Sequence, residues 1–356
     1  MEQKVVAIPQ SGSVEVIDVH VGGDLHRIVV GGVKEPEGAS VFEKMCDLRD
    51  HADGLRKLLL HEPRGGHPSL FADLVVTPQD PRAHAGFIIM ELMGYPLISG
   101  TNTICTAIAL LETGRIPIRE GINDVVLEAP GGLIDVKADC ANGKVRSITY
   151  QANTPSYIAE RNLSVEVPGY GRVVFDIAWT GAFYPLIRAE DLGFALEKAE
   201  EGRIVQFAGA FVQAAREKGI RPEHPEYGDE GPLSFAVLVS DASRSKEGMW
   251  QRRVCCYEYP RNSVCRAPAG VPSTAAMVQL IDRGILSVGD TLRTVSVFDT
   301  TLLARIVERV DYHGSDGYKA AVTGAGWITA QSRLIVDFSD PLTPTDGLAD
   351  IILQEV

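Results

Sequence analysis

Long apolar runs are absent from this chain. The longest apolar stretches, such as residues 104–111, fall far short of the roughly 20 apolar residues that a membrane-spanning helix needs. The N-terminal residues also lack the basic, apolar and small-residue order of a secretory signal peptide. The sequence therefore predicts a cytoplasmic protein with no membrane partner.

Clusters of basic residues are absent as well. The 34 lysines and arginines are outnumbered by 47 aspartates and glutamates, which gives a net charge of −13. Proteins that bind nucleic acid or anionic bilayers present a concentrated positive patch, so we expect neither partner. A small anionic ligand stays compatible with this composition, because a local positive field can exist inside an acidic protein.

The cysteine pattern lacks the spacings of a metal site. Six cysteines are present, but none form a CxxC pair and none stand at a zinc-type spacing from histidine. We therefore predict no bound metal and no cofactor held by cysteine. Free, buried thiols in a reducing compartment are the expected state.

Short strand-like runs dominate what is present. They are rich in β-branched residues, are bounded by Gly, Pro or Asp, and include residues 14–19, 27–30, 73–76, 87–91 and 124–128. Helical patterns are fewer and cover residues 41–60, 189–199 and 202–218. This balance predicts an α+β fold and excludes a doubly wound parallel sheet.

One internal repeat suggests the architecture. Residues 99–116 and 269–286 each contain a turn of small residues, an apolar run of about three helical turns and a glycine stop. Gly100 corresponds to Gly270, and Gly114 corresponds to Gly284. The first helix is apolar on most faces, which is typical of a buried helix. We predict two pseudo-symmetric lobes, each a mixed sheet wrapped around one buried helix.

The two repeated helix starts suggest a ligand site. A helix N-terminus offers unpaired N–H groups and about half a positive charge, and so it favours a carboxylate. Two such starts that face each other would hold one carboxylate, with Ser99 and Ala269 on either side of the adjacent carbon. Acid/base groups at those places would exchange an α-proton without a cofactor. The alternative is that both turns are tight corners in which only small residues fit.

At these residues the sequence resembles the proline racemase family along nearly its whole length. Residues 17–32 are similar to the family's opening strand pair, and Glu-Pro-Arg-Gly at residues 62–65 matches a short motif of the family. Residues 153–157, 181–184, 323–329 and 340–342 match further family segments in order. The resemblance implies the diaminopimelate-epimerase-like fold, cofactor-independent chemistry on a proline-like imino acid, and a homodimer.

The same resemblance shows where this chain departs from the family. The family's two catalytic cysteines fall on Ser99 and Ala269, and the histidine that follows the first falls on Thr101. An aspartate that helps to hold the substrate amine falls on Cys265. A serine hydroxyl is a weak base that needs a neighbour, and a methyl group cannot carry a proton.

We predict Ser99 and Cys265 as the candidate catalytic residues. The expected substrate-binding residues are His67, Gly100, Thr101, Asn102, Ala269, Gly270 and Val271. His67 lies one residue later than the family's histidine because Gly66 intervenes, and a plain loop position is the alternative for it.

The predicted activity is dehydration of trans-3-hydroxy-L-proline, with Ser99 removing the α-proton. Elimination needs one base, whereas racemisation needs a proton-transfer group on each face of Cα. Three alternatives stay open: a 4-hydroxyproline epimerase or proline racemase, an enzyme that acts on a different small carboxylate, and a non-catalytic imino-acid-binding protein. We expect an N-terminal lobe at residues 1–185 and a C-terminal lobe at 186–335. Residues 336–356 are expected to return to the first lobe.

Overall fold

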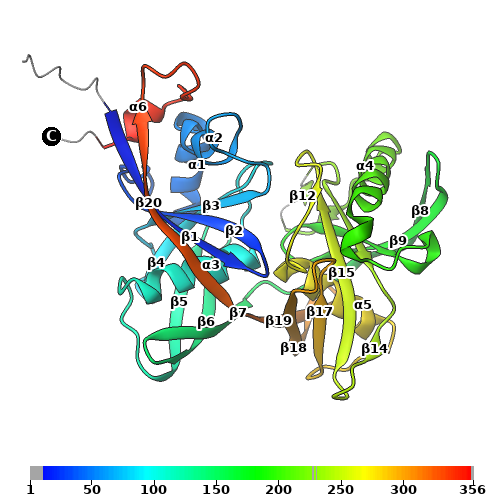
Figure 1. The fold of residues 1–356 in the computed structure, drawn as a ribbon. Coiled ribbons are helices and arrows are strands. Elements are labelled where there is room, and N and C mark those ends of the chain that lie inside the picture. Colours follow the sequence, from blue (N-terminus) through cyan, green and yellow to red (C-terminus); the bar gives the residue numbers. More distant parts are fainter. Residues whose placement is uncertain (1–10, 227, 230, 354–356) are drawn as a thin grey trace, which may run out of the picture.

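Strands outnumber helices along the chain (Figure 1). The computed structural model of the protein describes residues 11–353 apart from residues 227 and 230. The strands are β1 (Ser11–Val21), β2 (Asp24–Gly31), β3 (Leu70–Val76), β4 (Ala85–Met90), β5 (Gly121–Ala129), β6 (Gly132–Ala141), β7 (Lys144–Ala152), β8 (Tyr157–Val167), β9 (Gly171–Trp179), β10 (Phe183–Arg188), β11 (Glu223–His224), β12 (Gly228–Asp229), β13 (Phe235–Val239), β14 (Ser243–Arg244), β15 (Trp250–Glu258), β16 (Ser263–Val264), β17 (Thr291–Val295), β18 (Thr301–Tyr312), β19 (Ser315–Gly324) and β20 (Gly326–Asp337). The α-helices are α1 (Val41–His51), α2 (Gly54–Leu60), α3 (Gly100–Glu112), α4 (Glu201–Glu217), α5 (Gly270–Asp282) and α6 (Leu348–Ile351).

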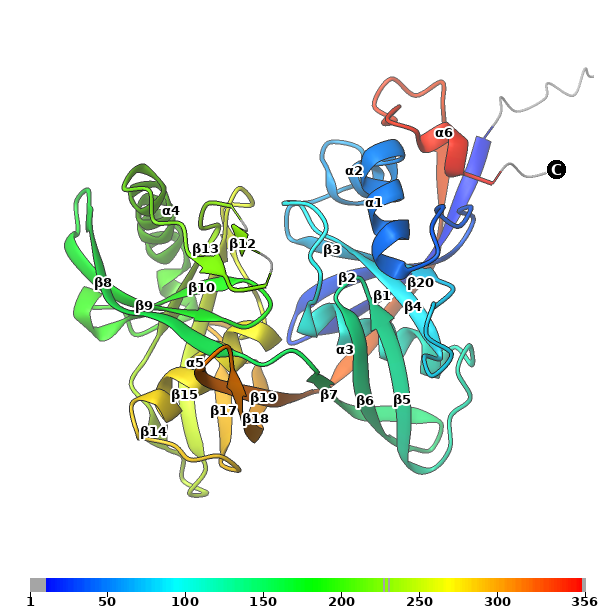
Figure 2. The same ribbon diagram turned by 180° about the vertical axis from the view of Figure 1, so that it is seen from behind.

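The N-terminal lobe is a sheet wrapped around helix α3. Its hydrogen-bonded strands follow the order β20-β1-β2-β3-β4-β5-β6-β7. Helix α3 is buried from Gly100 to Leu111, as its apolar faces predict. Helices α1, α2 and α6 lie together on the other side of this lobe and share a hydrophobic cluster with strands β1 to β4 (Figure 2).

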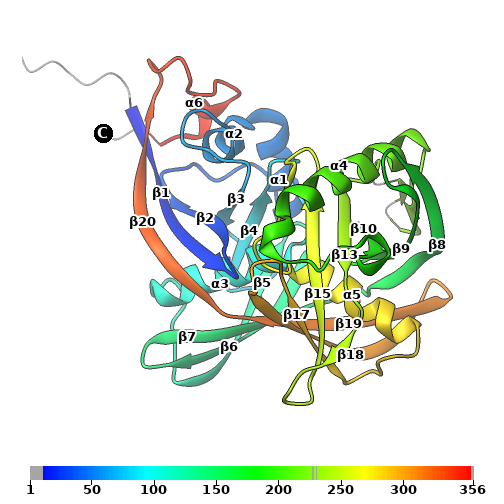
Figure 3. The same cartoon turned by 45° about the vertical axis from the view of Figure 1, so that its right-hand side comes forward.

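The C-terminal lobe repeats this plan around helix α5. Its strands follow the order β8-β9-β10-β13-β15-β17-β18-β19. Helix α4 packs on the outside of this lobe (Figure 3), where it shares a hydrophobic cluster with strands β8 to β10. The short strands β14 and β16 add to β15.

The two strand orders contain the same sequence of pairings. In each lobe, two antiparallel pairs are followed by a parallel pair, an antiparallel pair, a parallel pair and two more antiparallel pairs. Each series also encloses one buried helix. This confirms the α+β class and the two pseudo-symmetric lobes predicted from the repeat.

The lobe boundaries differ from those expected at residues 185/186 and 335/336. Strands β8 and β9 already pair within the C-terminal lobe, so the chain crosses between the lobes after β7. Strand β20 pairs with β1, so the chain returns to the N-terminal lobe after β19. Strands β7 and β19 join the two sheets edge to edge. Backbone pairing between distant segments decides lobe membership, and no local pattern in the sequence records it.

Two helix predictions need correction. Residues 41–60 form two helices, α1 and α2, and α1 begins with a capping box between Ser40 and Glu43. Residues 189–199 contain only short 3-10 turns, because Gly193 and Leu196 take positive φ angles of 68° and 59° and interrupt the helix. Helix α4 lies close to the expected residues 202–218.

One hydrophobic cluster joins the two lobes. It contains Ile104 and Ile108 of α3 together with Ala275 and Val278 of α5. This continuous core holds the two buried helices in a fixed relation to each other. Within the described residues, no helix combines the length and apolarity needed to cross a bilayer.

Candidate active site

The starts of α3 and α5 meet at the junction of the lobes. A Cβ atom added to Gly270 would lie 3.2 Å from the Cα atom of Gly100, and a Cβ atom added to either glycine would overlap the Tyr150 hydroxyl. Both positions therefore need glycine, because an added Cβ atom would overlap the Tyr150 side chain, and at Gly270 it would also crowd the backbone of Gly100. We call residues 99–103 the first entrance and residues 269–273 the second entrance.

Matched hydrogen bonds confirm that the two entrances are copies of one motif. The hydroxyl of Thr103 donates to the carbonyl of Ser99 over 2.7 Å, and the hydroxyl of Ser273 donates to the carbonyl of Ala269 over the same distance. The glycine stops after the two helices also agree, with Gly114 at φ 74° and Gly284 at φ 69°. The two copies of the motif therefore have similar geometry both at the helix start and at the glycine stop.

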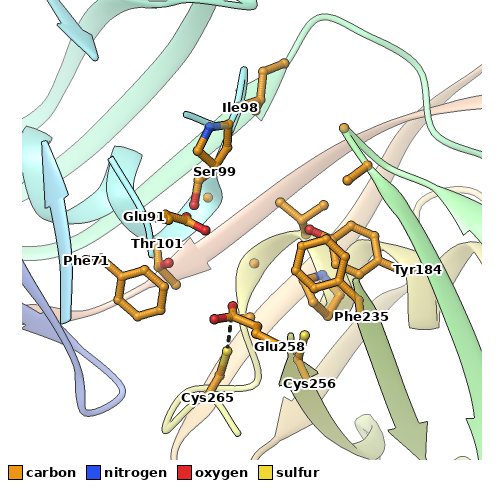
Figure 4. A pocket seen from close by; sticks show the side chains of 18 of the residues that line it. Phe71, Glu91, Ile98, Ser99, Thr101, Tyr184, Phe235, Cys256, Glu258 and Cys265 are labelled. Carbon is orange, nitrogen blue, oxygen red and sulfur yellow. Dashed lines mark hydrogen bonds between the residues drawn. The ribbon is translucent and has the colours of Figure 1, made fainter. Parts of the chain in front are cut away.

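A cavity of about 290 Å³ lies against both entrances. Figure 4 shows side chains from both lobes pointing into it. Its walls are formed by Asp24, Phe71, Glu91, Met93, Tyr95, Pro96, Ile98, Ser99, Gly100, Thr101, Gly181, Ala182, Tyr184, Ser234, Phe235, Cys256, Glu258, Cys265, Ala269, Gly270, Val271 and Pro272. A small molecule with one carboxylate fits a site that has helix N-termini on one wall.

A buried polar network stands behind the first entrance. The hydroxyl of Ser99 donates to Oδ1 of Asn102 over 2.6 Å, and Nδ2 of Asn102 donates to Oδ1 of Asp73 over 3.0 Å. Burial raises the pKa of Asp73 to about 7. The neighbouring His26 ring stays neutral, because burial and then the charge of Arg261 lower its pKa to about 3. The network directs the hydroxyl proton of Ser99 toward Asn102, which leaves oxygen lone pairs for a ligand.

The second entrance is built differently. Ala269 takes φ 58° and ψ 140°, a conformation that a residue with a side chain adopts only at a cost of roughly 1–3 kcal/mol. The hydroxyl groups of Ser273 and Thr294 are 2.8 Å apart behind it, with no carboxyl between them. Pro272 lacks an N–H group, so this entrance presents fewer backbone donors. Ala269 brings only a methyl group to the cavity.

Three carboxyl groups line the cavity. Oε2 of Glu258 accepts from the Arg261 guanidinium over 2.5 Å, and both side chains are buried. Burial, and then the negative charge of Glu258, raises the pKa of Glu91 well above its usual range. Burial also raises the pKa of Asp24 to about 6. The cavity therefore has an acidic wall as well as a wall of helix N-termini.

Cys265 lies at the foot of this acidic wall. Its thiol donates to Oε1 of Glu258 over 3.3 Å, as Figure 4 shows, and its backbone N–H donates to the carbonyl of Cys256 over 2.9 Å. A hydrogen bond with Cys256, together with burial, raises the pKa of the Cys265 thiol well above its ordinary value. Ligand atoms of Cys256, Glu258 and Cys265 lie within 4.8 Å of one another and form a group with metal-ligating chemistry. Glu258 is already charge-paired with Arg261, so the group is satisfied without an ion.

The structure brings most of the sequence-predicted site residues together. The cavity is lined by Ser99, Gly100, Thr101, Cys265, Ala269, Gly270 and Val271. Asn102 is fully buried behind the first entrance and reaches the site through Ser99. His67 does not line the cavity: it is exposed, and its Nδ1 accepts from the backbone N–H of Ser69 over 3.0 Å.

Sequence reasoning missed the acidic wall. Glu91 follows β4, and Glu258 ends β15, and these two strands hold equivalent places in the two lobes. A carboxyl residue at the end of each strand that precedes a repeated helix was the signal available in the sequence.

Comparison with known proteins agrees with this geometry. The family model described as proline racemase matches residues 16–347. A protein from Marinobacter nauticus is 39% identical over 341 residues, which are 96% of each chain. A hydroxyproline epimerase from Agrobacterium vitis, solved with trans-4-hydroxy-L-proline, is 27% identical with a TM-score of 0.83, and the match covers 93% of this chain and 94% of that one.

A second solved structure gives the same result. A probable proline racemase from Agrobacterium radiobacter K84, solved with carbonate, is 26% identical with a TM-score of 0.84, and the match covers 95% of this chain and 97% of that one. The mixed sheets, the paired buried helices and the family match along nearly the whole chain lead to one conclusion. The chain belongs to the proline racemase family.

Proposed function

We propose that the protein dehydrates trans-3-hydroxy-L-proline by removing its α-proton from the side of Ser99. The observation that carries this proposal is the inequality of the two entrances. One entrance presents a hydroxyl oxygen with a hydrogen-bonded support, and the other presents a methyl group. A reaction that needs proton transfer on only one face of Cα suits this arrangement best.

The substrate carboxylate binds between the entrances in this proposal. The backbone N–H groups at the start of α3 and those of Gly270 and Val271 at the start of α5 are the donors. This position leaves Ser99 and Ala269 on opposite faces of Cα. The electron pair that develops on Cα during proton removal is stabilised by delocalisation into the carboxylate, whose charge these N–H groups neutralise.

The support for Ser99 as the acceptor is its network. Asp73, when ionised, polarises the amide of Asn102, and the Asn102 oxygen then holds the Ser99 proton more strongly. The Ser99 oxygen accepts the α-proton as the C2–C3 double bond forms and the C3–O bond breaks. The proton and the hydroxide leave together as water, with Thr101 beside them as a hydroxyl donor. The resulting enamine tautomerises to a cyclic imine, so the reaction consumes no other reagent.

The proposal is tested by incubating the pure protein in D₂O with trans-3-hydroxy-L-proline, trans-4-hydroxy-L-proline and L-proline, followed by NMR. We expect the cyclic imine from the first substrate and no inversion of the third. Ser99→Ala should reduce product formation by about 10²–10⁴-fold. Ser234→Ala removes a different hydroxyl from the cavity wall and should retain activity. Racemised proline from the wild-type protein would contradict the proposal.

Epimerisation of 4-hydroxyproline is the second candidate. It is favoured by the structural similarity to a hydroxyproline epimerase that was solved with trans-4-hydroxy-L-proline. This reaction needs a proton donor on the Ala269 face, and the acidic wall is the available source. If the 2-epimer of trans-4-hydroxy-L-proline forms in the same NMR experiment, epimerisation becomes the assigned activity in place of dehydration.

A further inference from the structure

Two cysteines and a glutamate meet at the foot of the acidic wall. Cys256, Glu258 and Cys265 each line the cavity, and Figure 4 shows their side chains close together. One ligand atom from each residue, a thiol sulfur or a carboxylate oxygen, lies within 4.8 Å of the other two. Two soft sulfur ligands and one carboxylate form a set of donors that suits thiophilic divalent cations such as Zn²⁺.

A β-hairpin holds the two cysteines opposite each other. Strands β15 and β16 are antiparallel with Tyr257 opposite Val264, and the same register continued by one residue places Cys256 opposite Cys265. The backbone N–H of Cys265 donates to the carbonyl of Cys256 over 2.9 Å, in agreement with this register. Residues opposite each other in paired strands point to the same face of the sheet. Strand pairing therefore brings the two thiols together, although their spacing in the sequence is not that of a zinc motif.

Glu258 is oriented toward the two thiols by hydrogen bonds. Its Oε2 accepts from the Arg261 guanidinium over 2.5 Å, and its Oε1 accepts from the Cys265 thiol over 3.3 Å. Outer groups that orient a ligating carboxylate in this way are a regular feature of metal sites. A cation can replace the thiol proton between Oε1 and the Cys265 Sγ atom, because it binds both atoms. The fold does not require this cation, since the thiol proton and Arg261 already satisfy Glu258.

Charge balance permits the exchange of protons for a cation. Thiols are protonated at neutral pH. One divalent cation that binds two thiolates therefore releases two protons, and the total charge of the group does not change. The Arg261 guanidinium would repel a second cation, but it is outnumbered by the carboxyl groups of Asp24, Glu91 and Glu258.

We propose that Cys256, Glu258 and Cys265 form a binding site for a thiophilic divalent cation such as Zn²⁺. Tetrahedral zinc holds sulfur and oxygen ligands about 3.6–3.8 Å apart, and the three side chains are near these separations without an ion. Three protein ligands leave a fourth position, to which the cavity gives water or a small ligand access. This site is independent of the proposed function, in which no ion takes part.

The test titrates the reduced, metal-free protein with Co²⁺, which substitutes for Zn²⁺ and reports its ligands by absorption. Thiolate ligands give Co²⁺ an intense charge-transfer band in the near ultraviolet, whereas carboxylate and water ligands do not. We expect the band to saturate at one Co²⁺ per chain and to disappear when Zn²⁺ is added. Cys256→Ala and Cys265→Ala should each weaken Zn²⁺ binding by at least about 10²-fold, because loss of an outer partner alone costs about 10–100-fold.

Cys255→Ala is the matched control. Cys255 is 1% exposed, as is Cys256, but it lies in the hydrophobic cluster around α4 and does not line the cavity. This variant should keep the full charge-transfer band and the same affinity for Zn²⁺. A second measurement needs no variant: X-ray absorption of the wild-type protein with one equivalent of Zn²⁺ should show two sulfur ligands at about 2.3 Å.

Three outcomes would each overturn the site. They are a folded wild-type protein without the charge-transfer band, a zinc spectrum with only oxygen and nitrogen ligands, which indicates an adventitious ion, and unchanged affinity in a folded Cys265→Ala variant. The proposed function is judged separately by its NMR assay, run with a chelator. Dehydration by a protein that does not bind Co²⁺ through sulfur rejects the site and retains the function. A thiolate-bound ion without dehydration retains the site and rejects the function.

Discussion

The two entrances have the same backbone motif but carry opposite chemistry. The first entrance has an extended N-cap residue, Ser99, whose hydroxyl is linked through Asn102 to the buried carboxyl of Asp73. The second has a strained N-cap residue, Ala269, backed only by hydroxyl groups. Under the proposed function, symmetric packing determines where the carboxylate binds, and the residues that break the symmetry determine on which face of Cα proton transfer takes place.

The largest expected effect comes from making the entrances chemically alike. Replacing both Ser99 and Ala269 by cysteine places a proton-transfer group on each face of Cα. Because each positioned acid or base contributes about 10²–10⁴-fold, we expect racemisation of L-proline to rise at least about 10²-fold above the wild-type background. Polarimetry and NMR of Cα–H exchange in D₂O measure this gain.

The single variants provide the control for the double variant. Ser99→Cys alone should exchange the α-proton with retention, and Ala269→Cys alone should not invert proline. A folded double variant that exchanges no α-proton would show that the cavity does not place an imino acid between the entrances.

The next effect is a pH dependence of the free energy of unfolding, which comes from Asp73 behind the first entrance. The pKa of Asp73 is about 7 in the folded protein against an ordinary value of 3.8, so the folded state binds the proton more tightly than the unfolded state. The free energy of unfolding should therefore fall as pH rises from 4 through 7. In Asp73→Asn, the free energy of unfolding should fall by roughly 2–4 kcal/mol less over this pH range than in the wild-type protein. Urea unfolding at several pH values measures this difference.

A substitution at the second entrance checks that prediction. Thr294 is fully buried and hydrogen-bonds to Ser273, but it does not titrate. Thr294→Val should lower stability by a similar amount at every pH. Parallel pH curves for the wild-type protein and Asp73→Asn would mean that Asp73 does not titrate in this range.

The smallest expected effect concerns the missing donor at the second entrance. Pro272→Ala adds one backbone N–H group to the first turn of α5. Affinity for tetrahydrofuran-2-carboxylate should rise by about twofold to tenfold, the contribution of one hydrogen bond. Calorimetric titration measures it, with Pro96→Ala as a control that removes a cavity-wall proline that belongs to neither helix. A lower affinity in Pro272→Ala than in the wild-type protein would place the carboxylate away from this entrance.

Much of the candidate site was predictable because its signals are local. Gly100 and Gly270 each precede one of two matched apolar runs. A glycine at such a position indicates a place where a side chain would not fit. His67 shows where a local motif misleads. Its neighbours match the family segment, but Gly66 is inserted before it, and the structure leaves the ring exposed with Nδ1 accepting from the backbone N–H of Ser69.

By itself, the sequence determined the α+β class, the two repeated helices and the residues at their starts, because turn, apolar run and glycine stop are all short-range features. Only the tertiary structure decided that β8 and β9 belong to the second lobe, and that Glu91 and Glu258 share one cavity. Strand pairing joins segments that are far apart in the chain, and a buried carboxyl acquires its role from the charges that folding brings near it.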